Sequence, residues 1–247
     1  MKQFSWELKF GFGLVCLSLF LYSVHYAMFR DLHYIMLLCF INLAFLPISV
    51  LVVTLIINRL LAARERSLRL EKLNMLIGVF FSSAGTQLLS YFCTWNPEIR
   101  EIRTDLSPTS TWSKSDFWGA IRKAKEHPYH VQINPANLSE LRDFLMHKSD
   151  FLIRLLENPH LLEHEAFSNV LRAVFHLDEE LTCRKDLKAL PETDLEHLAG
   201  DIRRIYELLV HEWLKHLEYL KREYPYLFSL AIRLNPLDSE SSVIVRS

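Results

Sequence analysis

Two long apolar segments dominate the first quarter of the chain. Residues 10–29 and 32–58 contain no Lys, Arg, Asp or Glu, whereas the rest of the sequence mixes charged and apolar positions. At about 1.5 Å per residue in a helix, either segment can cross a hydrocarbon layer of about 30 Å. Only Arg30 and Asp31 separate them, so the pattern predicts two antiparallel transmembrane helices joined by a tight turn. A cleaved signal peptide fits the first segment less well, because the residues before Met28 make a poor small-residue cleavage site.

Lysine and arginine collect outside the two apolar segments. Lys2 and Lys9 precede the first segment, while the one Arg of the turn is matched by Asp31. The basic residues after the second segment are Arg59, Arg64, Arg66, Arg69 and Lys72. Basic residues favour the cytoplasmic side of a membrane. The sequence therefore predicts a multi-pass protein of the cytoplasmic membrane, with the lipid bilayer as a partner and both termini in the cytoplasm.

The segment after the second apolar stretch has two interpretations. A charged helix is expected over residues 59–73, and residues 74–92 carry no charge. Leu76, Phe80 and Leu88 recur at helical spacing, while most Ser and Thr residues fall on other faces. We therefore favour an amphipathic helix that packs on a cytosolic domain or lies in the membrane interface. A third transmembrane span is the alternative, and it would place the C-terminal domain on the opposite side of the membrane.

Three long amphipathic patterns dominate the second half of the chain. The expected helices run over residues 137–157, 161–183 and 194–224, with Asn137 and Thr193 as N-caps. The predicted fold class is all-α, an N-terminal transmembrane helical hairpin followed by a cytosolic antiparallel helical bundle. The expected domains are the two-span hairpin at 1–58, juxtamembrane helices at 59–93, a linker with a short helix at 94–136, the bundle at 137–234 and a mobile tail at 235–247.

One short motif suggests chemistry. HLLEH, residues 160–164, fits the H-x-x-E-H pattern of inverted-motif zinc peptidases. On one helix, His160 and His164 can reach a single zinc ion while Glu163 acts as a base on bound water. The resemblance ends with this motif, because those peptidases look like large α+β proteins with a distant third ligand. These residues are candidate metal ligands, but the sequence favours a solvated first turn of a helix.

Other signals for chemistry are weaker. HEWLKH, residues 211–216, resembles a zincin motif, but its histidines are five residues apart and so lie about 140° apart around a helix. No phosphate loop, catalytic triad or paired-cysteine pattern stands out, so we expect no cofactor and favour a binding protein over an enzyme. A net charge of −1 gives no global basic field for nucleic acid.

Three stretches carry a resemblance to known proteins: NMLIGVFFSSAGTQLL, ENPHLLEHEAF and REYPYLFSLAIRLNPLD, which begin at residues 74, 157 and 222. They resemble a group of prokaryotic membrane proteins of unassigned function that share a two-span start and a helical cytosolic region. The resemblance implies an integral membrane protein. It brings no activity, ligand or catalytic residue with it.

The function that fits these features is a membrane-anchored binding, scaffold or regulatory subunit. Its partner would be a second copy or another membrane or cytosolic protein. Tyr224, Tyr226, Leu227 and Phe228 form a candidate contact patch, although such rings more commonly close a helical core. Two alternatives stay open: a pore or transporter subunit whose water path includes Asn42 and Ser49, and a zinc-dependent peptidase that uses HLLEH near the membrane.

Overall fold

A computed structural model describes residues 2–162, 164–238 and 241–244 of the chain. Every regular element within these residues is a helix, and they include no strand, which confirms the predicted all-α class. The chain divides into two compact units, Met1–Arg66 (unit 1) and Ser67–Ser247 (unit 2).

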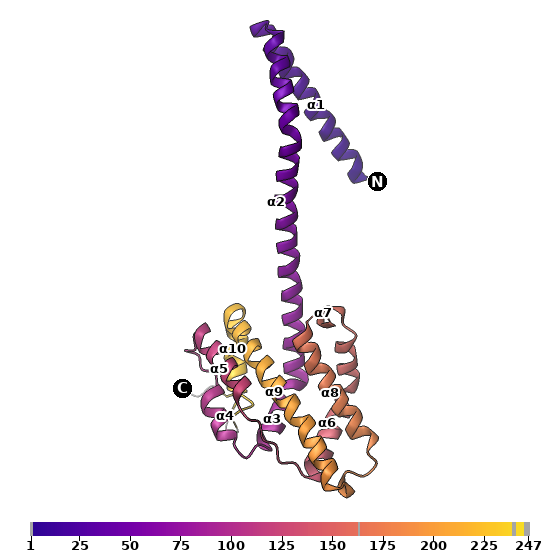
Figure 1. Cartoon of the computed structure of the whole chain (residues 1–247), viewed down its shortest axis with the longest axis vertical. Coiled ribbons are helices and arrows are strands. Elements are labelled where there is room, and N and C mark those ends of the chain that lie inside the picture. The colour runs from indigo at the N-terminus through magenta and orange to yellow at the C-terminus, as the bar shows by residue number, and fades with distance from the viewer. Residues whose placement is uncertain (1, 163, 239–240, 245–247) are drawn as a thin grey trace. The chain divides into compact units, whose positions relative to one another are not determined.

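Unit 1 contains α1 (Lys2–Phe29) and the first part of α2 (Leu32–Phe80), with a two-residue turn between them. Arg30 adopts a positive φ of 51°, and its N–H donates to the Tyr26 carbonyl at 2.9 Å, which ends α1. The Asp31 carboxylate then accepts the Tyr34 N–H at 3.0 Å and caps the start of α2. The chain therefore reverses at Arg30 and Asp31, the two charged residues between the apolar segments, and within unit 1 the two helices diverge from the turn (Figure 1).

The core of unit 2 begins inside the last turns of α2. It continues through a π-helical turn, η1 (Phe81–Gly85), and α3 (Thr86–Thr94). Phe80, Leu88 and Phe92 have no exposed surface, and the Phe80 ring packs edge-on against Phe167 with centroids 5.2 Å apart. The uncharged segment 74–92 thus packs inside the helical domain, which matches one of the two arrangements favoured above, and a third span would require this core to open.

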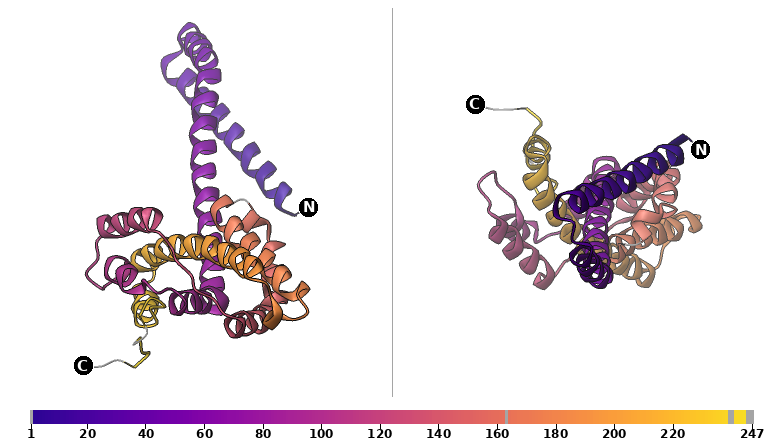
Figure 2. Two further views of the ribbon diagram at one scale, coloured as in Figure 1. Left: turned by 60° about the horizontal axis from the view of Figure 1, so that its bottom comes forward. Right: turned by 90° about the horizontal axis from the view of Figure 1, so that it is seen from above.

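The other helices of unit 2 pack around this segment. They are α4 (Ile99–Leu106), α5 (Lys114–Glu126), α6 (Pro135–Leu156), α7 (Pro159–Leu162), α8 (Glu165–Cys183), η2 (Leu187–Ala189), α9 (Glu192–Glu223) and α10 (Pro225–Arg233). The long α9 contacts α3, α5, α8 and α10, and α8 also contacts α6 (Figures 1 and 2). One face of α9 buries Ile202, Ile205, Leu209 and Trp213, which follow the expected spacing.

The helix ends differ from those expected. α6 begins at Pro135, because Asn134 is the N-cap and Asn137 closes the reciprocal capping box, with N–O distances of 2.9 and 3.0 Å.

Two further helix ends also differ. α9 begins at Glu192 after Pro191, so Thr193 lies in its first turn rather than at the cap. A single helix over residues 161–183 is also incorrect, because α7 ends at Leu162 and α8 begins after an N-cap at His164.

Packing in unit 2 involves segments that were expected to be linker or tail. Ile102, Leu106 and Phe117, from α4 and α5, are each 1% exposed, so the region expected as a linker with one short helix contributes to the core. Asn235 and Leu237 are also buried, and the Asn235 amide donates to Ser107 Oγ at 3.2 Å. Packing therefore extends beyond the predicted boundary at residue 234, and residues 239, 240 and 245–247 of the expected tail lie outside the described part of the chain.

Gly85 is required by the packing of the π-helical turn. A Cβ at this position would lie 2.6 Å from the Phe80 ring and 2.7 Å from the Phe81 ring, closer than real Cβ contacts. Gly119, inside α5, provides a contrast, because nothing lies within 4 Å of a Cβ added there.

We predict opposite effects for alanine at these two helical glycines. Gly85→Ala should lower the free energy of unfolding by about 1–3 kcal/mol, because it overpacks two buried rings. Gly119→Ala should raise it by about 0.5–1 kcal/mol, because alanine restricts the unfolded chain and favours helix. Denaturant unfolding of the full chain in neutral detergent, followed by circular dichroism, measures both values, and a stabilised Gly85→Ala variant would contradict the packing of η1.

Candidate functional site

The largest feature that the fold leaves unexplained is the apolar surface of unit 1. Leu8–Phe29 in α1 and a stretch of α2 are long and apolar enough to cross a membrane, and none of either apolar stretch is buried inside the structure. Phe12, Phe20 and Phe40, for example, are 72%, 63% and 68% exposed. The core helix of a water-soluble domain would bury such side chains. We therefore treat this apolar surface as the candidate functional site.

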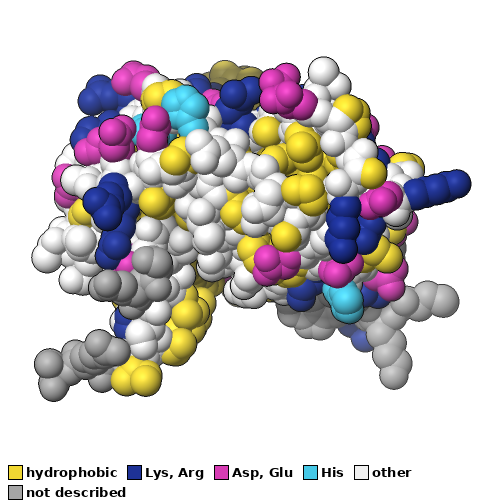
Figure 3. Space-filling view, turned by 90° about the horizontal axis from the view of Figure 1, so that it is seen from below, with side chains coloured by type: hydrophobic (Ala, Val, Ile, Leu, Met, Phe, Trp, Pro, Cys, Tyr) yellow, Lys and Arg dark blue, Asp and Glu magenta, His cyan; other side chains and the backbone are white. Residues whose placement is uncertain are grey.

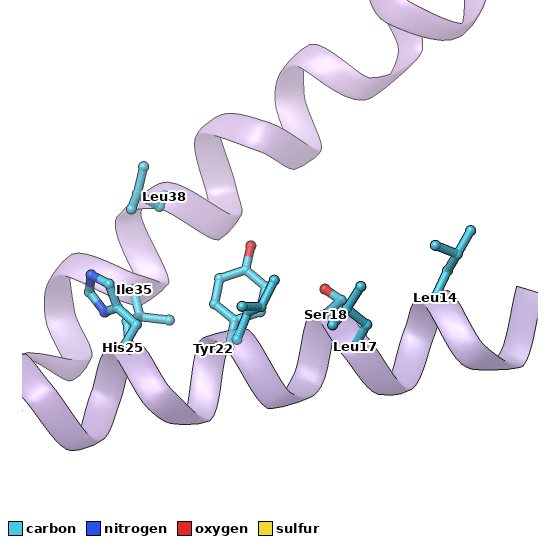
Figure 4. Close-up of a pocket in the computed structure, with 8 residues that line it drawn as sticks. Leu14, Leu17, Ser18, Tyr22, His25, Ile35 and Leu38 are labelled. Carbon is cyan, nitrogen blue, oxygen red and sulfur yellow. The ribbon is translucent and has the colours of Figure 1, made fainter.

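A cleft of about 410 Å³ lies between α1 and α2 within unit 1. Figure 4 shows side chains of α1, including Leu14, Ser18 and Tyr22, facing the space that opens as the helices diverge. At its narrow end the His25 ring stacks against Tyr34 with centroids 6.0 Å apart, and His25 Nδ1 is buried without a hydrogen-bond partner among the described residues. The cleft is thus mainly apolar, with one imidazole near the turn.

Two serines of the apolar segments form hydrogen bonds within their own helices. The hydroxyls of Ser23 and Ser49 donate to the carbonyls of Leu19 and Phe45 on their own helices, at 2.8 and 3.1 Å. The Asn42 side chain is exposed on the surface of unit 1. A water path that includes Asn42 and Ser49 stays a prediction.

The HLLEH histidines do not share a helix. His160 is in α7, and its backbone N–H donates to Asn158 Oδ1 at 3.0 Å. His164 is the N-cap of α8, where its Nδ1 accepts the Phe167 N–H at 3.2 Å. The expected arrangement of both histidines on one helical turn is therefore absent, and Glu163 lies outside the described residues. Within the described part of the chain, no group of three or more His, Cys, Asp and Glu side chains is arranged to hold a metal ion, so nothing here supports the peptidase alternative.

HEWLKH belongs to the core of unit 2. His216 is 8% exposed and its ring stacks on Phe81 with centroids 5.4 Å apart. Burial lowers the pKa of His216 to about 4. The buried Glu212 carboxylate accepts a hydrogen bond from Lys215 Nζ at 2.8 Å. Glu212 and His216 thus pack in the interior of unit 2.

A histidine and carboxylate cluster, which sequence spacing did not single out, joins α8 to α9. Asp201 Oδ2 lies 3.8 Å from His176 Nε2 and 3.5 Å from His197 Nε2. Glu180 approaches the same two rings at 3.8 and 3.9 Å.

An arginine bridge lies beside this cluster. The Arg184 guanidinium bridges Glu180 to Asp194, and its hydrogen bonds lower the pKa values of both carboxyls. These ion pairs therefore link the end of α8 to the start of α9. The i, i+4 spacings His176–Glu180 and His197–Asp201 were the available sequence signals.

The aromatic segment of α10 divides between core and surface. Phe228 is buried against Phe117, with ring centroids 6.1 Å apart. Tyr226 is 71% exposed and Leu227 is 40% exposed. Only part of the predicted contact patch is thus available to a partner.

Comparison with known proteins gives the family. A family model described as "MJ1433, N-terminal helical domain" matches residues 2–61, and one described as "Uncharacterized protein MJ1433, C-terminal helical domain" matches residues 69–233. The protein named "Uncharacterized protein MJ1433" from Methanocaldococcus jannaschii is 42% identical over 231 residues, which cover 94% of this chain and 93% of that protein. No solved structure matches the chain.

We predict that burial of His216 makes unit 2 less stable as the pH falls. The folded-state pKa of about 4 lies below the ordinary value of 6.5, so below pH 6.5 the unfolded chain takes up a proton that the folded chain does not. Stability should be full above pH 6.5 and decrease by up to about 3 kcal/mol towards pH 4. The expected contribution to the loss between pH 7.5 and 5.5 is about 1 kcal/mol.

Urea unfolding of the full chain in neutral detergent at these two pH values measures the effect. His216→Gln should reduce the loss by about 1 kcal/mol, because glutamine does not titrate. His147→Gln, at an exposed position of α6, is the control and should behave like the unsubstituted chain. Equal pH dependence in the His216→Gln and His147→Gln variants would contradict a neutral, buried His216.

Proposed function

The chain belongs to the MJ1433 family, and we propose that it is an integral membrane protein, with unit 1 as a two-span hairpin anchor and unit 2 as a cytosolic domain that acts by binding. The observation that carries this proposal is the exposure of apolar side chains along both helices of unit 1. Each large apolar side chain taken out of water contributes about 1.5–3 kcal/mol, so a hydrocarbon environment stabilises this surface and water does not. Helices also satisfy their own backbone groups, as a bilayer requires.

The charges that flank the apolar segments support the proposed orientation. Lys9 precedes the first span, and an arginine-rich stretch of α2 follows the second, whereas the turn carries Arg30 and Asp31 in balance. The positive-inside rule places both flanks in the cytoplasm. Unit 2 then lies in the cytoplasm, where basic side chains after residue 58 can also contact anionic lipid headgroups.

The surface of unit 2 fits a binding role. Acidic and basic side chains are interspersed with hydrophobic ones on the face shown in Figure 3, as on a water-soluble domain. Tyr226 and Leu227 add exposed apolar surface at α10, and contacts of this kind favour another protein or a second copy of the chain as the partner. We therefore propose a scaffold or regulatory subunit rather than an enzyme.

Membrane extraction tests the anchor. We predict that the full chain stays with the membrane pellet after washes with high salt and with alkaline carbonate, and enters solution only with detergent, because apolar burial does not depend on charge. A variant with Phe20→Lys and Leu51→Lys, two exposed positions of the proposed spans, should shift towards the carbonate-soluble fraction. Release of the unsubstituted chain by carbonate alone would contradict the anchor.

The single exposed cysteine of unit 2 then reports sidedness. Cys183 is exposed and Cys93 is buried, while Cys16 and Cys39 lie in the proposed spans. A membrane-impermeant maleimide should label Cys183 only after cells are permeabilised, and Cys183→Ser should remove that label. Labelling of Cys183 in intact cells would contradict the cytosolic assignment while leaving the anchor in place.

A further inference from the structure

A polar cleft of about 470 Å³ lies in unit 2 between α9 and the segment that follows α5. Lys125 comes from the end of α5, His127 and His130 come from the loop after it, and Arg203, Arg204 and Glu207 come from one face of α9. The volume is in the range of small-molecule sites, which run from about 300 to 1,000 Å³.

The lining of this cleft is strongly basic. It carries three permanent cations and two imidazoles against one carboxylate, Glu207. The whole chain has a net charge of −1, so composition alone does not account for this local excess. A concave surface with one sign of charge raises the local concentration of ions of the opposite sign.

The loop after α5, which forms one wall of the cleft, is held in place by contacts within the protein. Tyr129, between the two histidines, is 4% exposed, and its hydroxyl donates to the Ala124 carbonyl at 2.9 Å. Its ring packs against Tyr206 of α9 with centroids 4.8 Å apart. The Gln132 N–H donates to the Trp95 carbonyl at 2.8 Å and holds the far end of the loop. His127 and His130 are thus held on a rigid support, which reduces the entropic cost of binding.

Two of the basic groups already have partners. Arg204 bonds to Asp201, and His130 Nδ1 contacts Glu98 Oε2 at 2.7 Å. Lys125 and Arg203 have no ion pair or side-chain hydrogen bond with any residue that the structure describes. In the same part of the chain, His127 Nε2 is buried and has no hydrogen-bond partner. Buried polar atoms are normally paired, so the cleft has three groups suited to an incoming acceptor.

We propose that this cleft binds a phosphate group, carried by a small soluble phosphate ester or by a lipid headgroup, with Lys125, His127 and Arg203 as its donors. Arginine and lysine are the side chains that most often bind phosphate. Several oxygens of one phosphate dianion can accept hydrogen bonds from donors on both walls of the cleft, the end of α5 with the loop after it and α9. This site goes beyond the proposed membrane anchor and does not depend on it.

Calorimetric titration of the full chain in a neutral detergent with inorganic phosphate, at pH 7.5 and moderate salt, tests the proposal. Lys125→Ala with Arg203→Ala removes both unpaired cations of the cleft, and both side chains are exposed. Lys185→Ala with Arg154→Ala removes the same charge from exposed positions outside the cleft. We expect the dissociation constant to rise by about tenfold or more in the cleft variant, because charged hydrogen bonds are lost, and to stay within about twofold in the control variant.

Equal weakening of phosphate binding in the two double variants would overturn the site, because the loss would then follow from the net charge of the protein and not from the cleft. No measurable binding of phosphate by the unsubstituted chain would also overturn it. Circular dichroism spectra and melting temperatures of both variants should match those of the unsubstituted chain, so a loss of binding reports on the cleft. Short-chain phosphatidic acid added to the detergent micelles and glycerol 3-phosphate, a soluble ester, separate the two sources: tighter binding of the lipid assigns a headgroup, and tighter binding of glycerol 3-phosphate assigns a soluble ester.

Discussion

The exposed apolar surface of α1 and of the first part of α2 is the constraint on which the rest of the molecule depends. No core of unit 1 covers these helices, and the phenylalanine side chains described in them stay open over more than half of their area. Burial of apolar surface is the dominant favourable term in folding. Unit 1 is therefore incomplete in water, and in the proposed account the bilayer takes the place of a core. The tight turn places Arg30 and Asp31, the two charged residues between the apolar segments, at the tip of the hairpin.

The end of α2 meets a different environment from its beginning. Leu73 and Ile77 are buried in unit 2, whereas most apolar residues of α2 before Arg59 are exposed in unit 1. The π-helical turn that follows brings Phe80 and Phe81 onto Phe167 and His216. One sequence segment thus serves as the centre of the helical domain, and α9 packs along it with a face of Leu, Ile and aromatic residues. Charged groups are placed around this core, at the α8–α9 turn and in the basic cleft.

Much of the fold follows from hydrophobic periodicity, and the errors have local causes. The long helices α6, α8 and α9 were expected within a few residues, because their apolar positions recur at three and four. Asn134 was missed as a cap because Asn137 has the same chemistry, and the two act together in one capping box. α4 was missed because a short helix between proline-containing stretches has little periodicity of its own. The break at His164 depends on hydrogen bonds to Leu161 and Phe167 that no spacing rule anticipates.

The candidate sites were harder to predict than the helices. HLLEH looked like a metal motif only while it was assumed to lie on one helix. The basic cleft combines residues that are about 75 positions apart, and the cluster around Asp201 depends on the pairing of α8 with α9. Spacing along the sequence identifies side chains that share one helix face, but it does not show which helices pack against each other. The net charge of the whole chain, which is −1, also gives no sign of the local excess of basic side chains in the cleft.

The most direct measurement of the central claim is the environment of unit 1 itself. Cys16 and Cys39 are exposed on α1 and α2, so each can carry a nitroxide spin label in a variant of the full chain whose other cysteines are replaced by serine. Power-saturation spectroscopy in lipid vesicles then compares collisions with oxygen, which dissolves in hydrocarbon, and with a water-soluble nickel chelate. The account predicts strong relaxation by oxygen and little by nickel at both sites. Strong relaxation by nickel at either site would place that helix in water and contradict the account.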